Sequence, residues 1–247
     1  ELPNFIFAAI QYLSDLGHGK SLHCLGNAYH WRGDYDAAVN YLTLASQVGD
    51  TPSLWMLAAT FEQLALVRET GSKGPEAVKA VAVYKQAASA KPGSLCLLSI
   101  CRLADAYKTG YGVDVNLATA FEYNMIAADL GPKNFFHVTS GGTSNVSALY
   151  NIGLAYLEGH PFAAKSENNA AIYFRRAASV LDCPEVDAEE FGYKAAYELG
   201  MLAENRCANA IVRTPPTGNH NIQAHLQSAI FWMQKAESEG EDWLCTM

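Results

Sequence analysis

Cysteine and histidine side chains are the residues of this chain that could bind a metal, form disulfides or catalyse a reaction. The cysteines include no Cys-x-x-Cys pair, and none has a histidine at the spacing of a zinc site. His220 and His225 are five residues apart and would not share a helix face, and no His-Glu-x-x-His motif occurs. The spacing predicts no metal site, and it predicts reduced thiols that act as small core residues. The six cysteines are Cys24, Cys96, Cys101, Cys183, Cys207 and Cys245.

Motifs typical of catalysis or nucleotide binding do not occur in the sequence either. There is no Gly-x-Ser-x-Gly, no phosphate-binding glycine loop after a strand and no dinucleotide-binding fingerprint. Gly110 and Gly112 fit a turn between helices, and Glu189-Glu190 falls in a linker where both carboxylates would be solvated. We therefore expect no catalytic residues, no cofactor and no enzymatic activity.

Charge and hydropathy argue against two kinds of partner. The net charge is −8, and the 17 lysines and arginines are scattered, which argues against nucleic acid. The only adjacent basic pair, Arg175-Arg176, is expected on a solvated helix face. The longest apolar run, residues 95–100, is far below the ~18 residues that a membrane-spanning helix needs.

The compartment and the completeness of the chain stay open at this stage. Reduced thiols favour the cytoplasm or the mitochondrial matrix, whereas the sequon Asn145-Val146-Ser147 in an expected loop points weakly to secretion. The chain starts at Glu1 without a methionine, so a fragment of a longer protein and a processed organellar protein are both compatible with it.

The elements that must position any site are helices, because small and aromatic residues recur at offsets of zero, three, seven and eleven. These offsets return to one face of a 3.6-residue helix, so each set predicts a helix packed along that face. The sets are Ala38-Tyr41-Ala45-Gly49, Ala120-Tyr123-Ala127-Gly131 and Ala229-Trp232-Ala236-Gly240, with incomplete copies at Ala170-Tyr173-Ala177 and Val81-Tyr84-Ala88.

A second signature precedes each set: a leucine or isoleucine, then a glycine or alanine, then usually an aromatic ring one turn later. Ile152-Gly153 with Tyr156 is a clear copy. The small residue lets a second helix approach closely, so Gly153→Leu is expected to destabilise the fold by overpacking. The two signatures together predict a repeating hairpin of a helix A, a turn and an antiparallel helix B.

One repeat has a specific family resemblance. Residues 103–113 read Leu-Ala-Asp-Ala-Tyr-Lys-Thr-Gly-Tyr-Gly-Val and are followed by Ala120, Tyr123 and Ala127. This pattern resembles a SEL-one-like repeat, a subclass of the tetratricopeptide-like helical solenoids, and the first repeat, with Gly33-Asp34-Tyr35 in its turn, looks more like a plain tetratricopeptide repeat. The resemblance implies a right-handed superhelix that serves as an adaptor or scaffold without catalytic residues.

The expected fold is an all-α, right-handed α-solenoid of about five antiparallel helix-turn-helix repeats in a single domain over residues 1–247. Residues 1–18 are expected to form the last helix of a partial preceding repeat. Residues 70–75 and 210–221 are expected as long insertions between helices A and B, and 132–147 and 182–190 as linkers; surface decoration is the favoured interpretation of such loops. The repeats are expected over residues 20–50, 52–91, 97–131, 147–181 and 193–240.

The resemblance also implies where a partner would bind, since the A helices of such solenoids line the concave face. Residues three before, one after and four after the small A-helix residue are expected to face that groove, where aromatic side chains would anchor a peptide or a helix. An equally weighted alternative is that neighbouring A helices bury Trp55 and Tyr150 against each other. A clamp for a C-terminal carboxylate is not expected, since Asn27 fits that pattern but Ala59 breaks it. The predicted groove residues are His23, Asn27, His30, Trp55, Glu62, Asp105, Lys108, Tyr150, Leu154, Tyr197 and Met201.

Two functions follow as hypotheses. The first is a non-enzymatic adaptor or scaffold whose concave groove recruits a protein partner, either an extended peptide or a helix. The alternative is a structural accessory subunit of a large organellar, for example mitochondrial, or membrane-associated multiprotein complex. An adaptor should be monomeric in isolation, whereas an obligate subunit would expose large apolar patches and aggregate.

Overall fold

The computed structural model describes residues 10–14, 16–89, 94–130, 144–182, 190–213 and 220–237. Within these ranges the regular elements are helices, and the only β-type pairing is an isolated bridge between His160 and Ala163. The prediction of an all-α fold is confirmed. Residues 10–14 are helical, and the rest of the expected helix before residue 18 lies mostly outside the described ranges.

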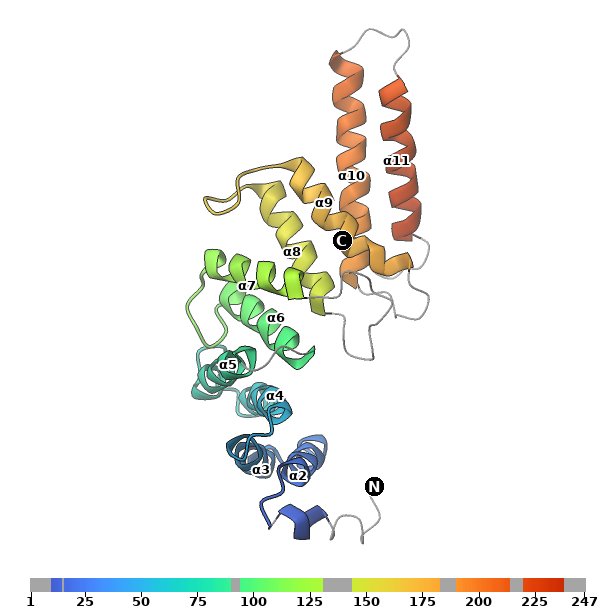
Figure 1. The fold of residues 1–247 in the computed structure, drawn as a ribbon. Helices are drawn as coiled ribbons and strands as arrows, with labels where there is room; N and C mark the ends of the chain where they lie inside the picture. Colours follow the sequence, from blue (N-terminus) through green and yellow to red (C-terminus); the bar gives the residue numbers. More distant parts are fainter. Residues whose placement is uncertain are drawn as a thin grey trace. The chain divides into compact units, whose positions relative to one another are not determined.

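The described helices follow one another in pairs joined by short turns or longer loops (Figure 1). The members of a pair contact each other, as α10 and α11 do side by side in Figure 1, and α6 and α7 do so through the rings of Tyr107 and Tyr123. The pairs are α2 (Gly19–Trp31) with α3 (Tyr35–Gln47), α4 (Pro52–Val67) with α5 (Pro75–Ala88), α6 (Ser94–Thr109) with α7 (Leu117–Leu130), α8 (Ser144–Glu158) with α9 (Glu167–Ala178), and α10 (Glu190–Arg213) with α11 (His220–Glu237).

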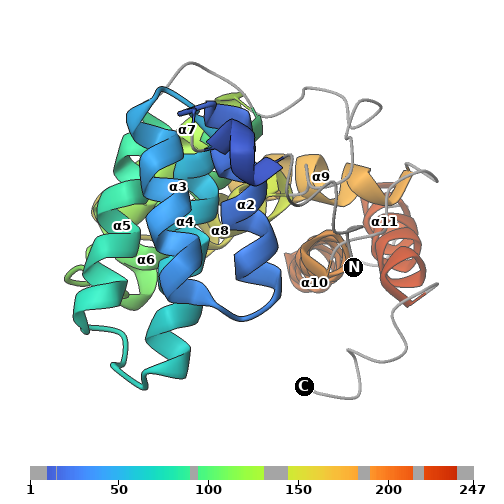
Figure 2. The same ribbon diagram turned by 90° about the horizontal axis from the view of Figure 1, so that it is seen from below.

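The chain divides into two compact bodies, Glu1–Tyr123 and Asn124–Met247, and the division falls within α7. We call them the N-terminal body and the C-terminal body and describe each by itself. In the N-terminal body α2 to α6 follow one another as a stack, each packed on the next (Figure 2). In the C-terminal body α8, α9, α10 and α11 pack in the same consecutive manner.

Local signals in the sequence explain where several helices begin. Asp34 caps α3, because its carboxylate accepts a hydrogen bond from the backbone N–H of Ala37 at 3.1 Å. Ser166 caps α9 in the same way through the N–H of Asn169. Pro52 and Pro75 stand at the first positions of α4 and α5, where a missing N–H costs nothing.

Tyrosine pairs close three of the helical hairpins. In each, the ring that follows the helix A signature stacks on the ring of the helix B stripe, with the two ring planes nearly parallel. The alanines of the same stripes are buried, as the sequence predicts, including Ala38 and Ala45 in α3. The pairs and their centroid distances are Tyr29–Tyr41 at 5.3 Å, Tyr107–Tyr123 at 5.8 Å and Tyr156–Tyr173 at 5.7 Å.

Glycine in helix A marks the point where the two helices of a hairpin are closest. A Cβ atom added to Gly26 would lie 2.5 Å from Cγ of Leu42, and one added to Gly153 would lie 2.5 Å from Cε1 of Phe174. Leu42 and Phe174 are fully buried and have no room to move aside. The close approach predicted at Gly153 is present.

In both bodies the A helices lie closer together than the B helices. In the N-terminal body α2 contacts α4 and α4 contacts α6, and no comparable contact joins α3 to α5 among the described residues. In the C-terminal body α8 contacts α10, whereas no comparable contact between α9 and α11 occurs in the part described. We call the layer of A helices the inner face of each body.

The structure corrects the predicted loops in two places. The insertion predicted at 210–221 is too long, because α10 continues to Arg213 and α11 starts at His220. Likewise, the last residues of the linker predicted at 132–147 already belong to α8. The remaining residues of these loops, and residues 183–189, lie outside the described ranges.

The insertion at 70–75 is not surface decoration, because it holds the turn of the next repeat. The N–H of Gly112 donates to the carbonyl of Ser72 at 2.6 Å. Beside it, Lys73 Nζ forms an ion pair with Asp114 at 2.9 Å and donates to the carbonyl of Val113. The favoured interpretation of this loop is therefore wrong. We call this contact the turn latch.

Candidate functional site

The inner face of the N-terminal body starts with a histidine bonded to the next A helix. His23 Nδ1 in α2 lies 3.0 Å from Oγ of Ser53 in α4, and the Ser53 hydroxyl donates to Asp50 at 2.5 Å. Because the serine proton is used in that bond, His23 Nδ1 must be the donor to Ser53. A His–Ser–Asp set suggests a hydrolase, but Ser53 is 0% exposed and its proton is directed away from the imidazole. The set joins two helices and has no access to a substrate.

A second histidine repeats this arrangement further along the two helices. His30 Nδ1 lies 2.9 Å from Oγ1 of Thr60, whose hydroxyl donates to the carbonyl of Met56 at 2.7 Å. His30 Nδ1 is therefore again the donor. Burial lowers the pKa of His30, because the charged imidazolium is disfavoured away from water. We call the two bonds, His23–Ser53 and His30–Thr60, the polar seam.

Two other predicted groove residues of this body, Asn27 and Trp55, have a buried polar atom that lacks a hydrogen-bond partner among the described residues. These atoms are Oδ1 of Asn27 and Nε1 of Trp55. Trp55 is half-buried, and its ring packs against the core cluster that contains Leu57 and Phe61. The indole thus serves at least partly as a core residue.

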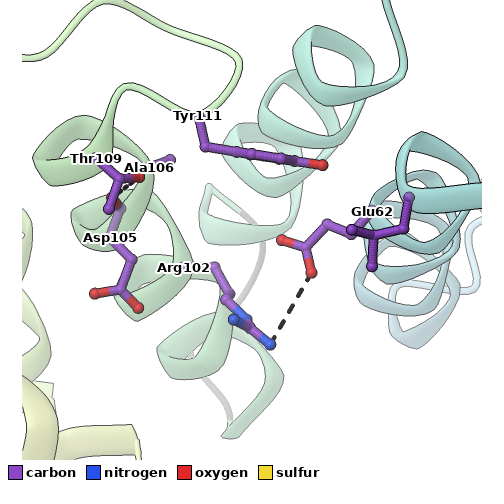
Figure 3. Close-up of a pocket in the computed structure, with 7 residues that line it drawn as sticks. Glu62, Arg102, Asp105, Ala106, Thr109 and Tyr111 are labelled. Atoms are coloured by element: carbon purple, nitrogen blue, oxygen red, sulfur yellow. Dashed lines mark hydrogen bonds and ion pairs between the residues drawn. The ribbon is translucent and has the colours of Figure 1, made fainter. Parts of the chain in front are cut away.

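A pocket of about 280 Å³ opens on the inner face between α4 and α6. Glu62 enters it from α4, and Arg102 and Asp105 enter from α6 (Figure 3). Figure 3 shows Glu62 and Arg102 pointing toward each other, with the Tyr111 ring lying across the gap between the helices. The pocket is lined by Glu62, Leu66, Arg102, Asp105, Ala106, Thr109 and Tyr111.

The carboxylates of this pocket are only loosely neutralised. Nη2 of Arg102 is 4.0 Å from Oε2 of Glu62, which is too long for a hydrogen bond, and the arginine side chain is 54% exposed. Burial raises the pKa of Glu62, and Arg102 opposes that rise only partly. The pKa of Asp105 is raised by the same desolvation, although Arg102 and Lys108 oppose it. With two carboxylates and one arginine, the groups that line the pocket carry one formal negative charge more than positive charge.

Two tyrosine hydroxyls next to Glu62 are also unsatisfied. The hydroxyls of Tyr84 and Tyr111 are buried and form no hydrogen bond among the described residues. Tyr84 is 1% exposed, and its hydroxyl lies beside the Glu62 carboxylate. Burial raises the pKa of both phenols, and the negative charge of Glu62 raises it further.

The inner face of the C-terminal body has aromatic rather than polar contacts. The Tyr150 ring lies 5.7 Å from that of Phe174 in α9 and 5.7 Å from that of Phe191 in α10. Burial, followed by the charges of three glutamates, raises the pKa of Tyr150 to about 12. The remaining predicted groove residues of this body, Leu154, Tyr197 and Met201, are half-buried.

The structure brings only two of the predicted groove residues, Glu62 and Asp105, into the pocket. Lys108 is exposed and close enough to act on the charge of Asp105, but it does not line the cavity. Sequence reasoning missed Arg102, which lies two positions before the small residue of its helix, and Tyr111, which lies in the turn. A lone arginine among the apolar residues of 95–104 was the signal that could have found the first.

Three further sequence features acquire a definite structural role. Asn145 is 1% exposed, so its side chain in the folded chain cannot carry a glycan. Cys101, on the inner side of α6, is buried, and Cys24 is exposed; neither forms a disulfide. Arg176 is exposed, yet it donates to the carbonyl of Ala128 at 2.9 Å and stacks on Tyr173, so it is more than a solvated residue.

Two searches of the described residues bear on alternative kinds of site. No three histidine, cysteine, aspartate or glutamate side chains lie within metal-binding reach of one another in those ranges. None of the helices there is long and apolar enough to cross a membrane.

Solved structures with the same arrangement of helices are Sel1 repeat proteins. A Sel1 repeat protein from Oxalobacter formigenes superposes with a TM-score of 0.56 at 16% identity, covering 92% of this chain and 75% of that one. A protective antigen of uropathogenic Escherichia coli strains with an SLR fold superposes with a TM-score of 0.53 at 16% identity, covering 95% of this chain and 49% of that one.

No family model matches the sequence. The relationship is therefore one of three-dimensional structure, and the sequence resemblance to SEL-one-like repeats is confirmed at that level. Solenoids of this kind form extended concave surfaces. The chain thus has the all-α solenoid fold of the Sel1 repeat proteins.

Proposed function

We propose that this protein is a non-enzymatic adaptor that binds a segment of a partner protein on the inner face of its N-terminal body. The observation that carries the proposal is the pocket between α4 and α6, where Glu62, Arg102 and Asp105 meet. Two carboxylates and an arginine converge there on one cavity, where they can interact with a side chain of a bound segment.

Three buried polar atoms without partners in this body belong to A helices or to the turn that follows one. Oδ1 of Asn27 is on α2, Nε1 of Trp55 is on α4, and the Tyr111 hydroxyl follows α6. A peptide lying across the three A helices would offer backbone N–H and C=O groups to such atoms. The inner face therefore combines a pocket for one side chain with hydrogen-bonding groups for a main chain.

Site-specific photocrosslinking tests the proposal. A benzophenone amino acid replaces Ala59 on α4, which is among the predicted inward positions, and in a matched chain it replaces Ala82, an exposed residue of α5. In the native source the Ala59 position should crosslink to a discrete partner and the Ala82 position should not. Crosslinking from Ala82 alone would show that recognition uses the outer helices, and the proposal would then be wrong.

A structural subunit of a larger assembly is a second candidate, favoured by apolar side chains that are exposed on both bodies. Trp31 is 79% exposed, Leu66 69% and Phe231 55%. A permanent subunit would bury such side chains in its assembly. Size-exclusion chromatography of the isolated chain separates the two functions, since an adaptor elutes as a monomer and an obligate subunit associates or aggregates.

A further inference from the structure

We propose that the pocket between α4 and α6 binds one basic side chain, a lysine or an arginine, of the partner segment. This inference rests on the proposed function and specifies the chemistry of the partner. It does not follow from the fold, since the carboxylate clamp considered for tetratricopeptide domains would recognise the opposite charge.

The first argument is the balance of charge in the pocket. Two carboxylates, Glu62 and Asp105, line it together with one cation, Arg102. Because Arg102 is 4.0 Å from Glu62 without a hydrogen bond, a second cation can approach the carboxylate without displacing a formed pair. The net charge of −8 on the chain attracts a basic segment and repels an acidic one.

The second argument is the unsatisfied phenols. Tyr84 is buried to 1% exposure with its hydroxyl beside Glu62, and the buried hydroxyl of Tyr111 points across the gap toward α4 in Figure 3. A phenol oxygen accepts hydrogen bonds, and an ammonium or guanidinium group offers several donors at once. A cation that binds Glu62 can therefore also donate a hydrogen bond to the phenol oxygen of Tyr111. An incoming carboxylate has no proton to donate and can only accept the phenol proton.

The third argument is size and lining. A cavity of about 280 Å³ is at the lower limit for small-molecule sites and suits a single amino-acid side chain. Leu66, Ala106 and the Tyr111 ring provide apolar walls, and the carboxylates provide a polar end. Lysine and arginine have the matching form, an apolar stem with a charged tip, and the ring adds a surface that attracts cations.

The test measures binding of single blocked amino acids to the full chain labelled with ¹⁵N. The probes are Nα-acetyl-lysine methylamide and the corresponding arginine, norleucine and glutamate compounds. The two basic probes should produce saturable shifts of the backbone amides of Ala106, Thr109 and Tyr111, and raising the salt concentration should weaken them. Norleucine, which has the stem of lysine without its charge, should leave these amides unchanged.

Three variants show which group recognises the probe. Glu62→Gln should weaken binding of the lysine probe about tenfold, because it removes a charged hydrogen-bond acceptor. The matched control Glu122→Gln, on an exposed residue of α7, should change it less than about twofold. Arg102→Gln removes the competing cation and should strengthen binding. Unchanged amide dispersion in each variant verifies that it is folded.

Each other outcome overturns the inference. Shifts with the glutamate probe that disappear in Arg102→Gln would show that the pocket binds acidic side chains. Equal shifts with norleucine and lysine would show an apolar site, and no shifts with any probe would show that the pocket takes no side chain. Since Ala59 crosslinking is measured independently, these results leave the adaptor function standing, and loss of that crosslinking would not affect the binding of the lysine probe.

Discussion

The two bodies use the same layer of A helices, but they join those helices in different ways. In the N-terminal body the polar seam connects α2 to α4 through histidine–hydroxyl hydrogen bonds. In the C-terminal body α8 meets α10 through Tyr150, whose ring lies between Phe174 and Phe191. The predicted groove position three before the small residue is thus a hydrogen-bond donor in the first repeat and a packing ring in the fourth.

This difference shows that alignment within a repeat fixes where a side chain points but not what it does. His23 and Tyr150 occupy the same repeat position, and both are used at least partly between helices of their own body. The position available to a partner is instead the pocket, one helix pair further along than the polar seam.

The largest effect is expected where the two bodies are alike. Gly153→Leu should lower the free energy of unfolding by about 3 kcal/mol, the upper end for overpacking, because Phe174 is fully buried at 2.5 Å from the added Cβ. Gly26→Leu should have a similar effect through Leu42. Urea denaturation measures both. A large loss in only one variant would show that the hairpins of the two bodies are not equivalent.

The next effect tests the aromatic contact of the C-terminal body. Tyr150→Ala should cost about 2 kcal/mol, less than a fully buried aromatic residue, because the ring is half-buried between two others. Tyr150→Phe keeps the ring and should cost less than about 0.5 kcal/mol. If instead Tyr150→Ala unfolds normally and abolishes partner crosslinking, Tyr150 is a binding residue, and the contrast between the bodies disappears.

A smaller effect, dependent on pH, is expected only in the N-terminal body. Burial lowers the pKa of His30 below its ordinary value of 6.5. In acid, the imidazole therefore binds a proton more readily in the unfolded chain than in the folded chain. Stability from this residue should therefore fall as the pH drops below about 6.5. The raised pKa values of Glu62 and Asp105 act in the opposite direction, since the folded chain binds those protons more readily.

The difference between wild type and His30→Gln isolates the histidine contribution. Denaturation at pH 7.5 and at pH 5.5 should show that the wild type loses more stability on acidification than the variant does, because burial lowers the pKa of His30. An identical loss in both proteins would mean that the His30–Thr60 bond of the polar seam does not depend on the charge of the imidazole.

The smallest effects concern adjacent arginines of α9. Arg175→Ala should change stability by less than about 0.5 kcal/mol, because Arg175 is exposed. Arg176→Ala should cost about 1 kcal/mol through loss of the hydrogen bond to Ala128 and the contact with Tyr173. Melting curves of the two variants measure the difference. Arg175→Ala is therefore the better surface control in any binding experiment.

Much of the fold could be predicted from the sequence, because helix packing repeats at a fixed spacing. The sequence spacing of Ala38, Ala45 and Gly153 predicts which face of each helix is packed, because residues at these offsets lie on one face of any α-helix. The polar seam could not be found in this way, since His23 and Ser53 are 30 residues apart and their contact depends on how two hairpins stack. No local pattern encodes that stacking.

The pocket was found only in part for the same reason. Glu62 and Asp105 were predicted from their repeat positions, but Arg102 reaches the cavity from a position outside the groove pattern. Tyr111 enters from a turn, where no helical period applies. Whether the predicted groove residues outside the pocket contact a partner stays a prediction.

The turn latch limits how far this solenoid can be treated as a string of exchangeable modules. A side chain at Gly112 would place its Cβ 2.3 Å from the carbonyl oxygen of Ala77, and the backbone there has a φ of +64°. The turn of the third repeat therefore fits a neighbour that has both a loop like residues 70–75, which bonds to the turn, and a helix like α5, which lies against Gly112. In recombination, natural or engineered, the second and third repeats should be inherited as one cassette, with productive crossover points on either side of the pair rather than between them.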